Sequence, residues 1–167
     1  MRGAVVNASP LVFLAKLDRL GALGIFSPVL TTEAVIREVE DGLPRGHPEI
    51  LAVRREVDAG RLKIRKVSES RIPGLDLGAG ELTVLRMASR AAGWVAIVDD
   101  LSAIRAAKRS GIDVLSTPFL LLENVGRGRM EPVAFRPALD QLMAEGYHLS
   151  PRLYVRLLEQ AAVAGRR

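Results

Sequence analysis

The run Val95-Ala96-Ile97-Val98 lies between two segments with helical patterning and ends at a pair of aspartates. A continuous apolar run of this length is typical of a parallel strand that is buried on both faces. Residues 4–6 form a second short apolar segment, which a helical pattern follows at once. Short strands that alternate with helices predict an α/β fold, with a parallel sheet between layers of helices.

Proline and hydroxyl residues mark the expected starts of several helices. Ser9, Thr117 and Ser150 each precede a proline, which predicts that they cap helices, and Thr31 or Thr32 is expected to cap another. The expected helices cover residues 10–17, 20–23, 33–41, 48–59, 79–92, 102–110, 118–126, 137–145 and 151–162. The expected strands cover residues 4–6, 29–30, 62–67, 95–98 and 113–115.

A chain of 167 residues fits one domain, and its 49% hydrophobic content is enough for a core. No repeat or low-complexity segment divides it, and a loop with Pro73 and Gly74 leads into the helix expected at 79–92. We expect residues 1–130 to form the sheet domain. Residues 131–167 are expected to form a C-terminal helical appendage packed on that domain.

The composition excludes several classes of protein. The absence of cysteine excludes disulfides and thiolate metal sites, and the two histidines argue against a histidine-rich zinc site. No apolar run approaches the roughly 20 residues that cross a bilayer. The N-terminus passes into a strand pattern without a cleavable signal. We therefore expect a cytoplasmic protein without a membrane partner.

The charge is basic overall but unevenly distributed. The net charge is +5 and the pI about 10.2. Residues 42–72 carry eight basic and four acidic side chains, whereas residues 73–125 carry five and six. A basic surface around an acidic pocket suits a polyanion that is held by its phosphates. A solvated arginine-rich surface is the alternative, and charge alone favours it.

Acidic and amide side chains follow the expected strands where ligands bind in parallel sheets. Asn7 ends the first strand, and Asp99-Asp100 end the apolar run. Adjacent carboxylates repel, so they need a cation, a basic partner or solvent, unless one of them caps the next helix. Glu81 falls in the first turn of a helix, and Glu38 borders an apolar helix face. Either glutamate alone is explained without a function. Together the five residues predict a site for magnesium or manganese, which prefer oxygen ligands.

Other functional motifs fit the sequence less well. Gly78-x-Gly80 suggests a dinucleotide loop, but position 83 is threonine and no strand precedes it. The chain has no GxxxxGK[ST] phosphate loop. Ser9 as a nucleophile lacks a histidine in a recognisable triad context. A small nucleotide-binding α/β domain remains a third hypothesis.

Four segments in this order resemble the PIN domain: NASPLVFLAKL, VIREVE, LGAGELTVLRMA and AIVDDLSAIRAAKRSGIDVLST. The resemblance covers nearly the whole chain. It is closest to a VapC-like toxin branch with an SPL motif after the first strand and extra C-terminal helices that end in a GYHLSPRLY-like segment. It implies a three-layer fold, metal-dependent endonucleolytic cleavage of RNA with Mg²⁺ or Mn²⁺, a homodimer and a cognate antitoxin protein.

The resemblance also assigns residues. It places the metal-binding positions at Asn7, Glu38, Glu81 and Asp99, with Asp100 as an additional or alternative catalytic ligand. Asn7 departs from the aspartate that is common in the family. An amide oxygen coordinates a hard cation but brings no charge, so we expect a lower metal affinity and reduced activity.

Several residues are candidates for contact with RNA. The resemblance places the hydroxyls of Ser9 and Thr117 near the site. One expected helix carries three basic residues close together on its surface: Arg105, Lys108 and Arg109. We expect this face either to contact RNA phosphates or to be a plain solvated face. Basic side chains between positions 44 and 71 are expected to hold the RNA backbone.

Two functions of different classes follow from these features. The leading hypothesis is a metal-dependent endoribonuclease that is the toxin of a type II toxin–antitoxin pair. The alternative is a catalytically weak PIN domain that acts as an RNA- or protein-binding regulatory module. Asn7 is the main support for the alternative.

Overall fold

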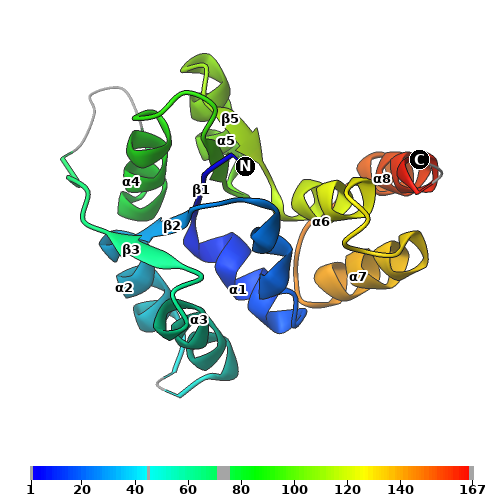
Figure 1. Cartoon of the computed structure of the whole chain (residues 1–167), viewed down its shortest axis with the longest axis horizontal. Coiled ribbons are helices and arrows are strands. Elements are labelled where there is room, and N and C mark those ends of the chain that lie inside the picture. Colours follow the sequence, from blue (N-terminus) through cyan, green and yellow to red (C-terminus); the bar gives the residue numbers. More distant parts are fainter. Residues whose placement is uncertain (1, 45, 71–75, 166–167) are drawn as a thin grey trace.

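The computed structural model of the chain describes residues 2–44, 46–70 and 76–165. Five parallel strands form one sheet in the order β3-β2-β1-β4-β5 (Figure 1). Their bounds are β1 (Ala4–Val6), β2 (Val29–Thr32), β3 (Lys63–Arg65), β4 (Val95–Ile97) and β5 (Asp113–Leu115). The predicted α/β fold with a parallel central sheet is confirmed.

Helices flank the sheet. They are α1 (Ala8–Lys16), the 3₁₀ helix η1 (Leu20–Ile25), α2 (Glu33–Gly42), α3 (Pro48–Asp58), α4 (Ala79–Ala88), α5 (Leu101–Arg109), α6 (Thr117–Gly126), α7 (Pro132–Ala144) and α8 (Pro151–Ala164). Helices α4 and α5 lie on one side of the sheet, and α1 and α3 lie on the other (Figure 1). Helices α7 and α8 gather beside α6, on the side of the molecule away from β3.

The register of the central strands aligns the residues that follow them. Val6 of β1 pairs with Ile97 of β4, and the Asn7 N–H donates to the Ile97 carbonyl at 3.0 Å. Both strands are fully buried, as their apolar sequences predict. Asn7 and Asp99 therefore emerge from neighbouring strands at the same edge of the sheet.

The C-terminal helices share the core of the sheet domain. Phe135 and Leu139 of α7 and Leu157 of α8 are fully buried in the same apolar cluster as Leu120 and Leu121 of α6. The expected appendage is therefore present and packed on the sheet domain, and the boundary at residue 130 stays a prediction. Within the described ranges, no helix has the length and apolarity needed to cross a membrane.

Two of the predicted helix caps are wrong, and both errors have the same cause. Helix α1 begins at Ala8 with Asn7 at the cap position, and α6 begins at Thr117 with Ser116 at the cap position. The Ser9 and Thr117 hydroxyls instead donate to the carboxylate of Asp99. A carboxylate is a stronger acceptor than a neutral group, so it takes these hydroxyls. The predicted caps at Thr32 and Ser150 are confirmed.

Other predicted boundaries also differ. Helix α7 begins at Pro132 rather than Pro137. Pro137 lies inside the helix and cannot donate a backbone hydrogen bond, but the burial of Phe135 stabilises the first turn despite this loss. Helix α4 ends at Ala88 rather than Ala92, since the chain must turn there to enter β4. Strand β3 is limited to the three residues that pair with β2. The loop containing Pro73 and Gly74 lies outside the described residues.

Candidate active site

A cleft of about 590 Å³ opens at the carboxyl edge of the sheet. Polar groups from α2, from α4 and from the residues that follow β1 and β4 form one part of it, and apolar side chains from α1, α5 and α6 form another. The segment between α7 and α8 closes one side. The cleft is lined by Asn7, Ser9, Phe13, Glu38, Glu81, Asp99, Asp100, Leu101, Ile104, Ser116, Phe119, Gly146, Tyr147, His148, Leu149 and Leu153.

Asn7 is buried where β1 passes into α1, with 2% of its surface exposed. Its Nδ2 donates to Glu81 Oε1 at 3.4 Å. Among the described residues, its Oδ1 has no hydrogen-bond partner although it is buried. A buried acceptor without a partner costs about 1–3 kcal/mol, so it marks a place where a ligand would be stabilising.

Gly80 makes room for this oxygen and for Glu38. A Cβ added at Gly80 would stand 2.9 Å from Asn7 Oδ1 and would collide with Glu38 Oε2. The Asn7 oxygen at the cap of α1 and the Glu38 oxygen on α2 therefore approach the same point beside the first turn of α4. Only glycine leaves this space open.

Glu38 and Glu81 reach the cleft from α2 and α4. Burial of its carboxylate, and then the nearby charge of Glu81, raise the pKa of Glu38 above its usual range. Because the two negative charges repel each other, the pair is stabilised either by a proton on Glu38 or by a cation bound between the carboxylates.

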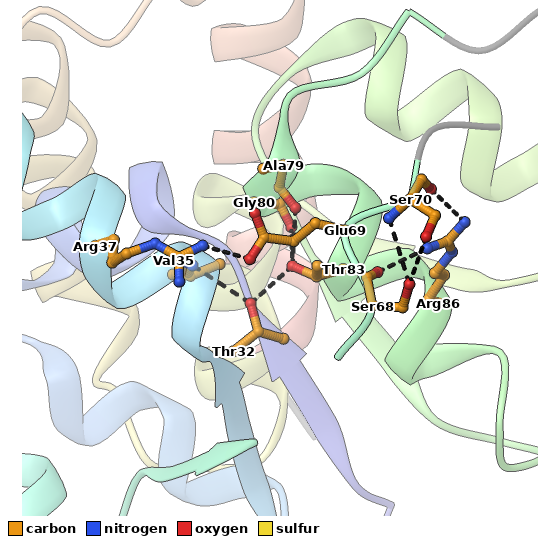
Figure 2. Close-up of polar contacts among 10 residues, drawn as sticks. All are labelled: Thr32, Val35, Arg37, Ser68, Glu69, Ser70, Ala79, Gly80, Thr83 and Arg86. Atoms are coloured by element: carbon orange, nitrogen blue, oxygen red, sulfur yellow. Dashed lines mark hydrogen bonds and ion pairs between the residues drawn. The ribbon is translucent and has the colours of Figure 1, made fainter. Parts of the chain in front are cut away.

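Buried hydroxyls fix the spacing of the two helices that carry these glutamates (Figure 2). The Thr83 hydroxyl on α4 donates toward the carbonyls of Ala79 and Gly80 and lies 2.7 Å from the Thr32 hydroxyl. The Thr32 oxygen accepts the Val35 N–H at the start of α2. The link therefore joins the first turn of α2 to the first turn of α4.

Asp99 is the most heavily hydrogen-bonded carboxylate of the cleft. Its Oδ1 accepts the Thr117 N–H at 2.7 Å and the Tyr147 hydroxyl at 3.0 Å. Its Oδ2 accepts the Thr117 hydroxyl at 2.7 Å and the Ser9 hydroxyl at 3.4 Å. Burial raises the pKa of Asp99, and the hydrogen bonds, led by those from Thr117, act in the opposite direction.

Asp100 lines the cleft and also caps a helix. Its Oδ1 accepts the Ala103 N–H at 2.9 Å at the start of α5. The sequence allowed for this role, since one of the two adjacent aspartates could cap the next helix.

Tyr147 is a member of the cleft that the sequence did not single out as a site residue. Its ring packs edge to face on Phe13, with centroids 5.2 Å apart and planes at 70°. Burial, and then the charge of Asp99, raise the pKa of its hydroxyl well above the usual range, so the group stays a neutral donor. The available signal was the GYHLSPRLY-like segment, in which Tyr147 is the second residue.

The comparisons with known proteins decide the family. The family model described as "DUF3368: PIN domain" matches residues 3–162. This chain belongs to the PIN domain family. Proteins of this family are generally nucleases and generally use divalent metal ions. None of the curated proteins compared with the chain matches it.

A solved PIN-like structure agrees with this fold. It is a PilT N-terminus domain protein, SSO1118, from the hyperthermophilic archaeon Sulfolobus solfataricus P2. The two chains superpose with a TM-score of 0.52 and are 18% identical over 72% of this PIN domain and 92% of the archaeal chain. At this identity the likeness concerns the fold alone.

The oxygens of this PIN domain's cleft suit a hard cation. No group of three or more His, Cys, Asp or Glu side chains among the described residues is arranged to hold a metal ion by itself. Mg²⁺, however, is usually held by one or two carboxylates and keeps several waters. The unpartnered Asn7 Oδ1, Glu38 beside the same glycine and the adjoining Glu81 form such a set.

The basic residues expected to bind RNA lie outside the cleft lining. Arg105, Lys108 and Arg109 are exposed on α5. Arg54 and Arg61, in the basic stretch, form ion pairs with glutamates on the protein itself. The basic residues at positions 45 and 71 lie outside the described part of the chain. The assigned RNA contacts therefore stay predictions.

Proposed function

We propose that this PIN domain is a metal-dependent endoribonuclease that uses Mg²⁺ or Mn²⁺ and acts as the toxin of a type II toxin–antitoxin pair. The observation that carries the proposal is the buried Asn7 Oδ1, which has no partner in the described chain and faces the same point as Glu38. The family, whose members are generally metal-using nucleases, supports the same reaction class.

The proposed site divides its roles among its residues. Asn7, Glu38, Glu81 and Asp99 would hold the cation, and Asp100 would assist from the cap of α5. A divalent cation held by these residues would supply Lewis-acid activation of water and charge neutralisation at the phosphate. The hydroxyls of Ser9 and Thr117 orient Asp99. Leu101, Ile104 and Phe119 line the apolar part of the cleft.

The direct test is cleavage of single-stranded RNA with Mn²⁺ by the wild type, Asp99→Asn and Asn7→Asp. We expect wild-type cleavage, a loss of at least 100-fold in Asp99→Asn on the scale of a lost metal ligand, and a gain in Asn7→Asp. Asp58→Asn, at an exposed position at the end of α3, is the matched control. Equal cleavage by the wild type and Asp99→Asn would show that the site is wrong.

The alternative function is a catalytically weak binding or regulatory module. Two observations favour it: position 7 carries no charge, and Asp99 already accepts four hydrogen bonds. The same experiment separates the two functions. If the wild type and Asp99→Asn are equally inert and Asn7→Asp gains activity, the binding function is favoured.

The proposed partners are a cognate antitoxin and a second copy of the chain. The acidic cleft supports an antitoxin that inserts an arginine against the carboxylates. Exposed apolar side chains, including Val133 at 81% and Val163 at 60%, support a self-association surface. Light scattering of the purified chain, alone and with the product of an adjoining short reading frame, tests both. A monomer that binds no such product contradicts them.

A further inference from the structure

The segment between α7 and α8 is fixed in place next to the cleft. Gly146 leaves α7 with a φ of 96°, and the Tyr147 N–H donates back to the Leu142 carbonyl at 3.1 Å. The end of α7 is also tied to the end of α1, because Lys16 Nζ lies 3.1 Å from Glu145 Oε2. These contacts bring Tyr147 to Phe13, which α1 carries.

The Tyr147 hydroxyl occupies a particular acceptor position on Asp99. Each carboxylate oxygen has about two lone-pair sites. On Oδ1, the Thr117 N–H and the Tyr147 hydroxyl fill both sites at short distances. On Oδ2, the Thr117 hydroxyl fills one site at 2.7 Å, while the Ser9 hydroxyl makes only a long contact at 3.4 Å. Of the two oxygens, Oδ2 is therefore the one that can take a further ligand.

We propose that Tyr147 is a positioning residue whose hydroxyl locks Asp99 so that its carboxylate offers a single oxygen, Oδ2, to a divalent cation in the cleft. The inference rests on the proposed metal-dependent function and deepens it. The C-terminal helical extension thereby becomes part of the proposed active site, because Tyr147, which donates to Asp99, follows α7 in the chain. Without this donor, Oδ1 regains a free acceptor site, and the two bonds from Thr117 and the long contact from Ser9 are left to hold the carboxylate.

The chain contains a matched control for the loss of this hydroxyl. Tyr154 on α8 also donates to an aspartate, Asp140, at 2.5 Å. Neither residue lines the cleft, and their bond is exposed to solvent. Tyr154→Phe therefore removes the same kind of bond from the same extension without touching Asp99.

The experiment measures Mn²⁺ binding to the full chain by calorimetry, in the absence of RNA, for the wild type, Tyr147→Phe and Tyr154→Phe. We expect the dissociation constant to rise about tenfold in Tyr147→Phe, which is the scale for a lost partner of a metal ligand. Tyr154→Phe should bind as the wild type does. Thermal melts without metal show whether both variants keep the fold. Equal Mn²⁺ affinity of Tyr147→Phe and the wild type would overturn the inference.

Cleavage assays on the same samples separate this inference from the proposed function. If the wild type binds Mn²⁺ but cleaves no RNA, the nuclease proposal fails while the affinity comparison still decides the role of Tyr147. If the wild type cleaves and Tyr147→Phe matches it in kcat and affinity, only the inference fails. A wild type that binds no Mn²⁺ overturns both. Should Tyr147→Phe not fold, Phe13→Leu releases the ring from its packing, and an unchanged Mn²⁺ affinity in that variant also overturns the inference.

Discussion

Asp99 accepts both the backbone N–H and the hydroxyl of Thr117, each at 2.7 Å. The carboxylate at the end of β4 therefore acts as the cap of α6, which begins 18 residues later in the chain. A negative charge at the positive end of a helix is favourable, so this contact serves stability as well as the cleft.

Thr117→Val removes the hydroxyl and keeps the side chain's shape. We expect the free energy of unfolding to fall by about 2 kcal/mol, because a mostly buried carboxylate loses a charge-assisted hydrogen bond. Urea denaturation measures the change. Thr117→Ser keeps the donor and should lose less. Equal losses in the two variants would mean that the hydroxyl contributes no more than the methyl group and would contradict this prediction.

The raised pKa of Glu38 predicts a pH dependence of stability. The fold disfavours the charged form, first by burial and then through Glu81. The contribution is therefore fully present below the ordinary pKa, about 4.3, and is lost as the pH rises through the folded value. In metal-free buffer, Glu38→Gln should gain stability relative to the wild type as the pH rises from about 4 to 7. Thermal melts across this range measure the gain, and the exposed Glu159→Gln should show none.

Asn7→Asp adds a charge at the unpartnered oxygen, beside two glutamates. We expect lower stability without metal, and Mn²⁺ binding tighter by about tenfold, or about 1.4 kcal/mol. Melting curves with and without Mn²⁺ measure both effects. Asn124→Asp is the control, because this buried amide donates to two backbone carbonyls of residues that do not line the cleft. It should lose stability with no response to Mn²⁺. A similar response in both variants would exclude a site at position 7.

Gly80→Ala places a methyl group against Glu38 Oε2 and near Asn7 Oδ1. We expect Mn²⁺ affinity to fall by on the order of tenfold, because the two oxygens are pushed apart. Gly42→Ala is the matched control, since a Cβ there meets nothing within 4 Å. It should leave Mn²⁺ binding unchanged and increase stability slightly, by about 0.5–1 kcal/mol. Unchanged binding in Gly80→Ala would contradict a cation at this point.

The fold was predictable because its signals are local. The apolar run at 95–98 and the residues that punctuate the helices lie within a few positions of the structure they specify. The caps at Ser9 and Thr117 were wrong because their acceptor, Asp99, is 90 and 18 positions away. Tyr147 was missed for the same reason, since it meets Asp99 across 48 positions. The structure places the five proposed site residues around one cleft, and their roles in binding metal stay predictions.

The link between Thr32 and Thr83 consists of two uncharged hydroxyls, both fully buried. Added salt does not screen it, and neither group titrates near neutral pH. The spacing between α2 and α4 should thus be the same in dilute and in concentrated buffer. Apart from the surface ion pairs, such as those of Arg54 and Arg61, the response of this protein to ionic strength should report on bound ions and bound polyanions, while the frame that carries Glu38 and Glu81 stays constant.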